Sequence, residues 1–359
     1  MQRNAVQLLK RLKFEREHII LRNHITIKDI ARSLDLSYST VSLALNDAPV
    51  VNARTRQRVQ DYARSVNYRP NASARAISTG RTYLVGAVLG RFTNSFFEEI
   101  AQGIENVASQ RGFDVILNTS GFGGASEDSH LSRLIDRRIE GVICTRYSIS
   151  QQGIERLEKM EIPILLLRAD ACGPQTYVAV DNRLGGRLAV EHLAALGHRH
   201  ILYVGYEFVH SQLREEGARE AARDCGVRME SINVPAAVDR SAAFAAVTRR
   251  AKAMRDFTAV FCADDVIAVG AIQALQEIGL RVPQDISVVG FDDLRWAPLI
   301  NPPLTTVHQP QISQGETAME LLIAMVEGQQ VASTVLAPRL VVRGSSAPLA
   351  KRVANGRSG

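Results

Sequence analysis

Short apolar runs alternate with helical segments along most of this chain, and this alternation restricts the fold more than any other feature. A first series of runs lies near residues 84–89, 114–117, 141–144 and 163–167. A second series lies near residues 200–204, 259–262 and 286–289. Strand–helix alternation predicts parallel sheets that are covered by helices on both faces. Two series in one chain predict an α/β core of two doubly wound parallel-sheet lobes with a cleft between them.

The charge of the chain is concentrated at its N-terminal end. The sequence has 359 residues and a net charge of +6. Residues 1–80 hold 14 Lys and Arg against 6 Asp and Glu, so the rest of the chain is slightly acidic in sum. This asymmetry indicates an N-terminal segment that faces a polyanion. A solvated basic face without a partner is an equally good interpretation of charge alone, so the residue pattern must decide.

The basic segment has the pattern of three short helices. Thr26 and Asp29 form a helix-start signature in which each side chain can satisfy a free backbone N–H group. Apolar residues then recur at helical spacing, and Ser37 is placed to cap a second helix over 38–46. A third helix is expected over 53–67, with its arginines largely outside. Two short helices joined by a tight turn are typical of a helix-turn-helix, whose second helix enters the major groove of DNA.

Four segments carry a more specific signal: 25–32 (ITIKDIAR), 39–42 (STVS), 55–59 (TRQRV) and 67–71 (NYRPN). In this order and spacing they resemble the lactose-repressor (LacI-type) family of bacterial transcription regulators, and the resemblance extends from about residue 25 to residue 346. It implies an all-α helix-turn-helix headpiece followed by a periplasmic-binding-protein-like core. It also implies a homodimer that represses transcription from a near-palindromic DNA operator under the control of a small-molecule effector.

The resemblance implies a domain organisation. Residues 1–24 would be an extension of unknown role, 25–70 the DNA-binding headpiece, 71–81 a hinge, 82–346 the effector-binding and dimerisation core, and 347–359 a tail. The N-lobe is expected at about 82–181 and 308–328, and the C-lobe at about 182–307 and 329–346. The chain would therefore cross between the lobes three times.

The resemblance also places DNA contacts. It puts Tyr38, Ser39 and Leu43 at base-reading positions. It assigns phosphate contacts to Thr26, Ser37, Ser42, Asn46 and Asn52, and minor-groove contacts in the hinge to Ala74 and Ile77.

Two headpiece positions depart from the family pattern. Asp35 replaces the usual turn glycine, and Asp is one of the few residues that tolerate a left-handed conformation. Leu43 replaces a common Arg, which would grip guanine through two hydrogen bonds. Leu can make only apolar contacts, so we expect an operator half-site without a strict guanine at that position. Packing of Leu43 against the third helix is the structural alternative.

Ligands of doubly wound sheets bind outside the carboxyl ends of the strands. Strand ends and crossovers carry Phe96, Phe97, Arg168, Asp264 and Gln309, and the family resemblance adds Arg214 and Asp292 as effector-binding residues. Core packing of Phe97 is an open alternative.

Arg168 stands where family members often carry Asp. Together with Arg214 it would supply two guanidinium groups, which pair with carboxylate or phosphate. This favours a sugar acid or a sugar phosphate as the effector. Asp264 could instead neutralise Arg168 within the protein, which would leave a neutral sugar open.

Other function classes lack support in the sequence. HExxH, paired CxxC and GxSxG motifs do not occur, and the glycine-rich segment 121–124 lacks the third glycine of a dinucleotide loop. We therefore expect no enzyme, no cofactor and no metal. Dispersed cysteines and the lack of a long apolar run predict a cytoplasmic protein with reduced thiols and no membrane partner. The alternative function is a periplasmic-type ligand-binding protein without a DNA role.

Overall fold

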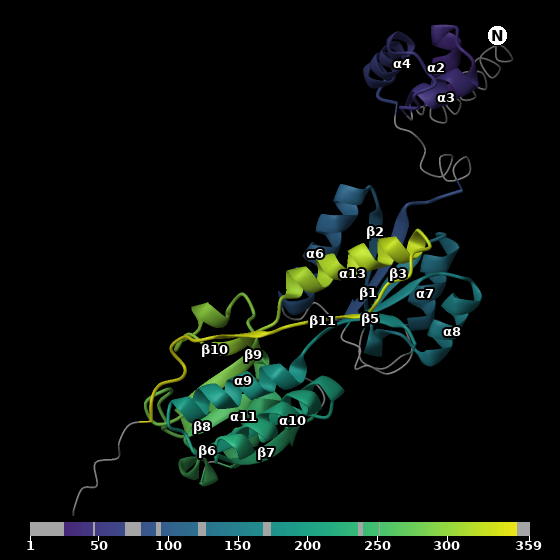
Figure 1. Ribbon diagram of the computed structural model, residues 1–359. Coiled ribbons are helices and arrows are strands. Elements are labelled where there is room, and N and C mark those ends of the chain that lie inside the picture. Colours follow the sequence, from purple (N-terminus) through teal and green to yellow (C-terminus); the bar gives the residue numbers. More distant parts are fainter. Residues whose placement is uncertain are drawn as a thin grey trace, which may run out of the picture. The chain divides into compact units, whose positions relative to one another are not determined.

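The computed structural model describes residues 25–45, 47–68, 80–90, 95–120, 127–167, 174–235, 240–250 and 252–349 (Figure 1). The chain divides into two compact units, Met1–Thr82 and Tyr83–Gly359, each of which is described by itself. Among the predicted site residues, Asn46, Ala74, Ile77 and Arg168 lie outside the described residues, as do the extension 1–24 and most of the hinge.

The first unit contains the three expected helices, α2 (Ile27–Leu34), α3 (Tyr38–Leu45) and α4 (Ala53–Ser65). Thr26 and Asp29 form the capping box at the start of α2. Asp35 ends α2 in the left-handed conformation, with φ 53° and ψ 48°, and the Ser37 hydroxyl accepts a hydrogen bond from the Thr40 amide at 3.0 Å. The predicted helix-turn-helix is therefore confirmed down to its caps.

A small apolar core joins the three helices. Ile30, Val41 and Val59 are fully buried at its centre. One of the α4 arginines that were expected to lie largely outside is partly buried. Arg56 is half-buried, and its Nη2 donates to the carbonyls of Ala48 and Val51 at 3.0 and 2.9 Å, which fixes the loop between α3 and α4. The sequence pattern missed this because a long Arg stem can pack while its head group bonds backbone.

The second unit contains two six-stranded sheets. In the first lobe the strand order is β11-β5-β4-β3-β1-β2, and all of these pairs are parallel. Its strands are β1 (Leu84–Gly90), β2 (Asp114–Ser120), β3 (Gly141–Thr145), β4 (Ile164–Leu167), β5 (Thr176–Val180) and β11 (Thr334–Leu336). Its helices are α6 (Ser95–Arg111), α7 (Glu127–Asp136), α8 (Gln151–Lys159) and α13 (Gln311–Val326). Separate apolar clusters line the two faces, one beneath α6 and α13 and one beneath α7 and α8.

The second lobe repeats this architecture with the order β12-β10-β9-β8-β6-β7, in which β12 alone runs antiparallel to its neighbour. Its strands are β6 (His200–Tyr206), β7 (Arg228–Val234), β8 (Ala259–Cys262), β9 (Ser287–Asp292), β10 (Thr305–His308) and β12 (Arg339–Val341). Its helices are α9 (Asn182–Ala195), α10 (Val209–Asp224), α11 (Arg240–Arg249) and α12 (Asp265–Glu277). The chain moves in opposite directions along the sheet from β6 to β7 and from β7 to β9. Right-handed crossovers therefore place α10 and the pair α11–α12 on opposite faces.

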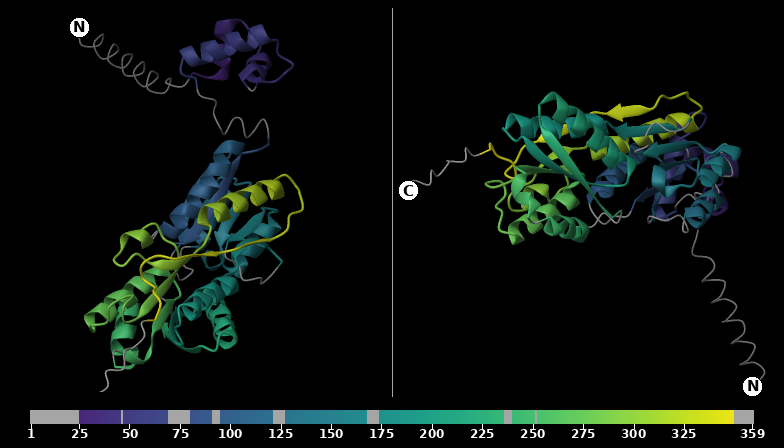
Figure 2. Two further views of the ribbon diagram at one scale, coloured as in Figure 1. Left: turned by 60° about the vertical axis from the view of Figure 1, so that its left-hand side comes forward. Right: turned by 90° about the horizontal axis from the view of Figure 1, so that it is seen from below.

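The chain crosses between the lobes after β5, after β10 and after β11 (Figure 2). The third crossing corrects the expected C-lobe range of 329–346. Thr334–Leu336 pairs with β5 of the first lobe, and the second lobe resumes with β12. Both strands have three residues and are partly exposed, so they lack the apolar run by which a buried strand is recognised.

Each lobe contains one very close helix crossing at a pair of glycines. In the second lobe Gly186 of α9 faces the carbonyl of Arg214, and Gly217 of α10 faces the carbonyl of Arg183. In the first lobe Gly103 of α6 and Gly315 of α13 form the same reciprocal arrangement. A Cβ at any of these positions would overlap a backbone carbonyl of the opposite helix. Glycine is therefore required by backbone proximity, and the crossing fixes the position of Arg214 one turn away.

The cysteines in the described part of the chain, Cys144, Cys225 and Cys262, are free thiols, as expected. Within the same part of the chain, no helix combines the length and apolar character needed to cross a bilayer.

Gly217→Ala should destabilise the protein by about 1–3 kcal/mol, because α9 and α10 must separate to admit the methyl group. The measurement is denaturant unfolding of the full chain, with Gln212→Ala at an exposed position of α10 as the matched control. Equal unfolding midpoints for the two variants would contradict the close crossing.

Candidate functional site

The outward face of α3 carries the predicted base-reading residues. Tyr38 and Leu43 are 53% and 40% exposed, and Ser39 is also exposed. Val41 and Ala44 on the opposite side are fully buried, so helix periodicity separates the two faces cleanly. The exposure of Leu43 argues against its alternative role as a core residue. The face offers hydroxyl groups and an apolar side chain, and no charged group.

Three of the predicted phosphate contacts, Thr26, Ser37 and Asn52, lie at the N-terminal ends of helices, whereas Ser42 lies within α3. The Ser37 hydroxyl precedes α3 and lies 2.8 Å from the Ser39 hydroxyl, and Asn52 Oδ1 accepts from the Thr55 backbone amide at 2.8 Å at the start of α4. Helix N-termini attract anions through their free N–H groups and dipole. Thr26 is less suited to this role, because its hydroxyl donates to the Asp29 carboxylate at 2.6 Å. The phosphate assignments, including Ser42, stay predictions.

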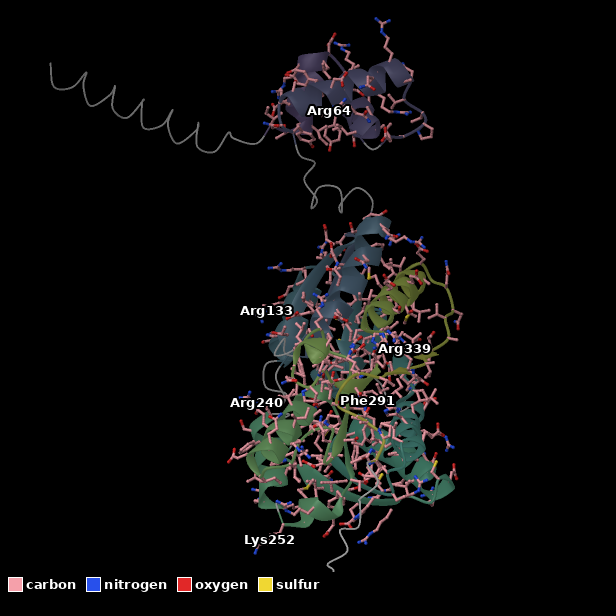
Figure 3. All side chains as sticks on the ribbon, turned by 90° about the vertical axis from the view of Figure 1, so that its left-hand side faces the viewer. Arg64, Arg133, Arg240, Lys252, Phe291 and Arg339 are labelled. Carbon is pink, nitrogen blue, oxygen red and sulfur yellow. The ribbon has the colours of Figure 1, made fainter. Side chains whose placement is uncertain are left out.

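Arg214 is the centre of a buried polar cluster at the junction of the two lobes. It projects from α10, is 1% exposed, and its Nε donates to Asn182 Oδ1 at 2.9 Å while its Nη1 donates to the Ala263 carbonyl. Its Cζ lies 3.6 Å from the ring centroid of Phe291, a cation–π contact. Figure 3 labels Phe291 in the interior of the body. Nη2 of Arg214 lies 3.5 Å from Oδ1 of Asp292.

Asp292 links this cluster to the second crossing. It ends β9, is 8% exposed, and its Oδ1 accepts from Gln309 Nε2 at 2.5 Å. Its backbone has φ 110° and that of Asp293 has φ 58°, a left-handed pair that is costly for residues other than glycine. Asp293 is held by His308 and Arg343, at 3.1 and 2.6 Å. The structure thus brings Arg214, Asp292 and Gln309 together as predicted, while their effector role stays a prediction.

Asp264 and Asp265 both accept hydrogen bonds that hold the start of α12 in place. Asp264 is the N-cap of α12 and accepts from the Ile267 amide at 2.8 Å. Asp265 is completely buried and accepts from the Leu294 amide and from the Thr306 hydroxyl, at 2.8 and 2.6 Å. Burial and the neighbouring Asp292 raise the pKa of Asp264 to about 6 and the pKa of Asp265 well above its ordinary value.

The aromatic candidates belong to the core of the first lobe. Phe96 and Phe97 are 3% and 8% exposed, and their rings meet edge to face at 5.2 Å. Phe97 also packs over Gly90 at the end of β1, where a Cβ would collide with its ring. This geometry favours the core alternative for Phe97. Both rings lie on the first turn of α6, which follows the carboxyl end of β1.

Sequence reasoning missed several polar residues at the junction. Tyr206, whose hydroxyl bonds to Asp264, also lies 3.0 Å from His210 Nε2, and Asn182 orients Arg214. Gln311 donates from Nε2 to the carbonyl of Asp292 at 2.5 Å. A polar residue at the start of a helix is so common that spacing alone gave no signal. Buried glutamines at 311 and 314, within an otherwise apolar helical face, were the available hint.

Two other features do not supply a site. A surface hollow of about 460 Å³ lies at the opposite ends of the first-lobe strands, lined by residues such as Glu161, Pro163 and Gln329 and by none of the predicted effector residues. Within the described residues, no group of three or more His, Cys, Asp and Glu side chains is arranged to hold a metal ion.

Asp264→Asn should stabilise the protein by roughly 1–3 kcal/mol at pH 7.5. Because the pKa of Asp264 is raised in the folded state, ionisation of this carboxyl lowers the unfolding free energy of the wild-type protein as the pH rises from about 4 to about 6. Asn keeps the helix cap and never ionises. The measurement is the unfolding free energy of both proteins from pH 4 to 8. A stability difference that does not change with pH would contradict this account.

Comparison with known families agrees with both units. Residues 26–71 match the family "Bacterial regulatory proteins, lacI family", and residues 190–346 match the family "Periplasmic binding protein-like domain". The first match covers the helix-turn-helix and removes the alternative of a ligand-binding protein without a DNA role. The second covers most of the second lobe and the segments that return to it.

Individual relatives span nearly the whole chain. The HTH-type transcriptional repressor PurR of Aliivibrio fischeri (strain ATCC 700601 / ES114) is 32% identical over 338 residues, which cover 89% of this chain and 98% of the relative. The lac repressor dimer bound to operator and the anti-inducer ONPF matches with a TM-score of 0.81 and 29% identity, over 90% of this chain and 99% of that one. The transcriptional regulator CelR–cellobiose complex matches with a TM-score of 0.67 and 27% identity, over 90% and 100%. The chain therefore belongs to the lacI family of bacterial regulatory proteins, as a DNA-binding transcription repressor and not an enzyme.

Proposed function

We propose that this repressor acts as a homodimer on a near-palindromic operator and that a sugar derivative bound at the lobe junction controls its operator affinity. The observation that carries the proposal is the buried cluster of Arg214, Asp292 and Gln309, where elements of the second lobe meet the second crossing. Burying charged groups costs free energy, so they are seldom buried without a role. Ligands of doubly wound sheets bind outside the carboxyl ends of the strands, which is where this cluster lies.

The proposed effector carries an acid group that pairs with Arg168 and Arg214. Arg214 supports this because its Nη2 is buried and has no hydrogen-bond partner among the described residues. Nε and Nη1 donate to Asn182 and Ala263, whereas Nη2 has only an ion-pair contact of 3.5 Å with Asp292, so its N–H groups can still donate to an oxygen ligand. Cellobiose in the related CelR complex supports a sugar framework. Asp264 and Asp292 add acceptors for the hydroxyl groups of such a ligand.

The control mechanism is thermodynamic linkage. An effector that binds one arrangement of the two lobes more tightly than another shifts the population toward it. If the two arrangements differ in operator affinity, the coupling free energy is typically about 1–3 kcal/mol. The sign of the response, induction or co-repression, depends on which arrangement the effector prefers.

At the operator, we propose that Tyr38, Ser39 and Leu43 face base edges in the major groove. Binding selection from random duplexes should return half-sites without a strict guanine opposite Leu43. Leu43→Arg should gain a guanine preference of about 1–3 kcal/mol through a bidentate contact. Val50→Arg, which adds the same charge at a 77% exposed position in the loop before α4, is the matched control and should raise affinity without changing the preferred base. A strict guanine in the wild-type selection would contradict the proposal.

The effector class is tested by thermal shift of the full chain. D-Gluconate, D-glucuronate and glucose 6-phosphate should raise the melting temperature, whereas D-glucose, D-ribose and adenine should not. Arg168→Ala should abolish the distinction between acidic and neutral sugars, because it removes one of the two proposed acid-binding guanidinium groups. A response to neutral sugars alone would show that the acid group is not recognised.

A further inference from the structure

Two glutamines on the first turn of α13 are buried with unsatisfied amide groups. Gln311 is 1% exposed and Gln314 is fully buried. Gln311 Oε1 and both amide atoms of Gln314 have no hydrogen-bond partner among the described residues. Each buried polar group left unpaired costs about 1–3 kcal/mol, so such groups are rare outside functional sites. We propose that Gln311 and Gln314 form a donor–acceptor wall that recognises the hydroxyl groups of the effector.

This inference rests on the proposed effector site, and the chain path places the glutamines beside it. Helix α13 begins directly after the second crossing, and the backbone N–H of Gln311 donates to the backbone carbonyl of Gln309 at 2.9 Å. Gln309 and Gln311 both donate from Nε2 to Asp292, the first to its carboxylate and the second to its carbonyl, each at 2.5 Å. The first turn of α13 therefore lies against the end of β9, where Asp292 meets Arg214.

Gln314 follows Gln311 by three residues, on the face of α13 that packs inward. Ala318 and Leu322 continue this face at helical spacing and belong to the apolar core. The next residue, Gly315, lies against the carbonyl of Ile100 in the close crossing with α6. The backbone at Gln314 is consequently fixed, and only its side-chain torsions can move the amide. An apolar residue would satisfy the packing, so the amide requires another explanation.

The unsatisfied atoms define what a ligand must offer. Gln311 and Gln314 present two acceptor oxygens, and Gln314 Nε2 and Arg214 Nη2 present two donors. A hydroxyl group both donates and accepts, whereas an ionised acid group only accepts. An acid without hydroxyls would leave both glutamine oxygens unpaired. The wall therefore selects a polyhydroxylated acid, with hydroxyls toward α13 and the acid group toward the arginines, over a simple carboxylate.

The test replaces the amide by an apolar group of the same length. Gln314→Met should raise the melting temperature of the free protein, because it removes two unpaired polar atoms without changing the volume greatly. The same variant should need about tenfold more D-gluconate or glucose 6-phosphate for a half-maximal thermal shift, which corresponds to the loss of about one hydrogen bond. Gln314→Leu provides a second apolar variant. Gln152→Met, at an exposed position of α8, is the matched control and should change neither quantity.

The outcomes separate this inference from the proposed function. A lower melting temperature of both free Gln314 variants would show that the amide has a structural partner and would overturn the inference. An unchanged half-maximal concentration in a wild type that responds to these acids would overturn the inference alone. A wild type that responds to none of the sugar acids, or equally to inorganic phosphate, would overturn both the effector class and the role of the glutamines.

Discussion

The second lobe is organised around one buried guanidinium group. Arg214 can be buried only because separate segments compensate it: Asn182 at the start of α9, the Ala263 carbonyl after β8, and Phe291 and Asp292 at the end of β9. Leaving such a charge unpaired costs several kcal/mol, so these segments must meet at one point for the lobe to fold. The glycine crossing of α9 and α10 makes this possible, because any larger residue would hold the two helices apart.

The same cluster is connected to the first lobe through a short loop. The left-handed turn at Asp292 and Asp293 leads directly to Leu294, which is buried in the apolar cluster of the first lobe. Arg295 then pairs with Glu99 of α6 at 2.8 Å. A ligand bound to Asp292 thus lies only two to three residues along the chain from Leu294 and Arg295, which contact the first lobe. Because the turn is held on both sides, by Asp265 and by Arg343, a shift of Asp292 cannot be absorbed locally.

Local sequence rules predicted the elements that depend on local interactions. The capping box at Thr26, the left-handed Asp35 and the central strands of both sheets follow from cap chemistry, steric tolerance and apolar runs. The pattern did not reveal β11, because a short and partly exposed edge strand has no apolar run. The unsatisfied amides could not be predicted, because satisfaction of a buried group depends on partners that are distant in sequence.

The energetic scale of the site suits a regulatory switch. The buried amides of Gln311 and Gln314 and the strained turn at Asp292 each cost the free protein about 1–3 kcal/mol. Coupling between effector and operator requires about the same amount. A ligand that satisfied one or two of these groups in one lobe arrangement, and not in the other, would supply free energy on the scale of that coupling. A fully satisfied junction would be more stable, but it would give an effector no unpaired groups through which to distinguish the two arrangements.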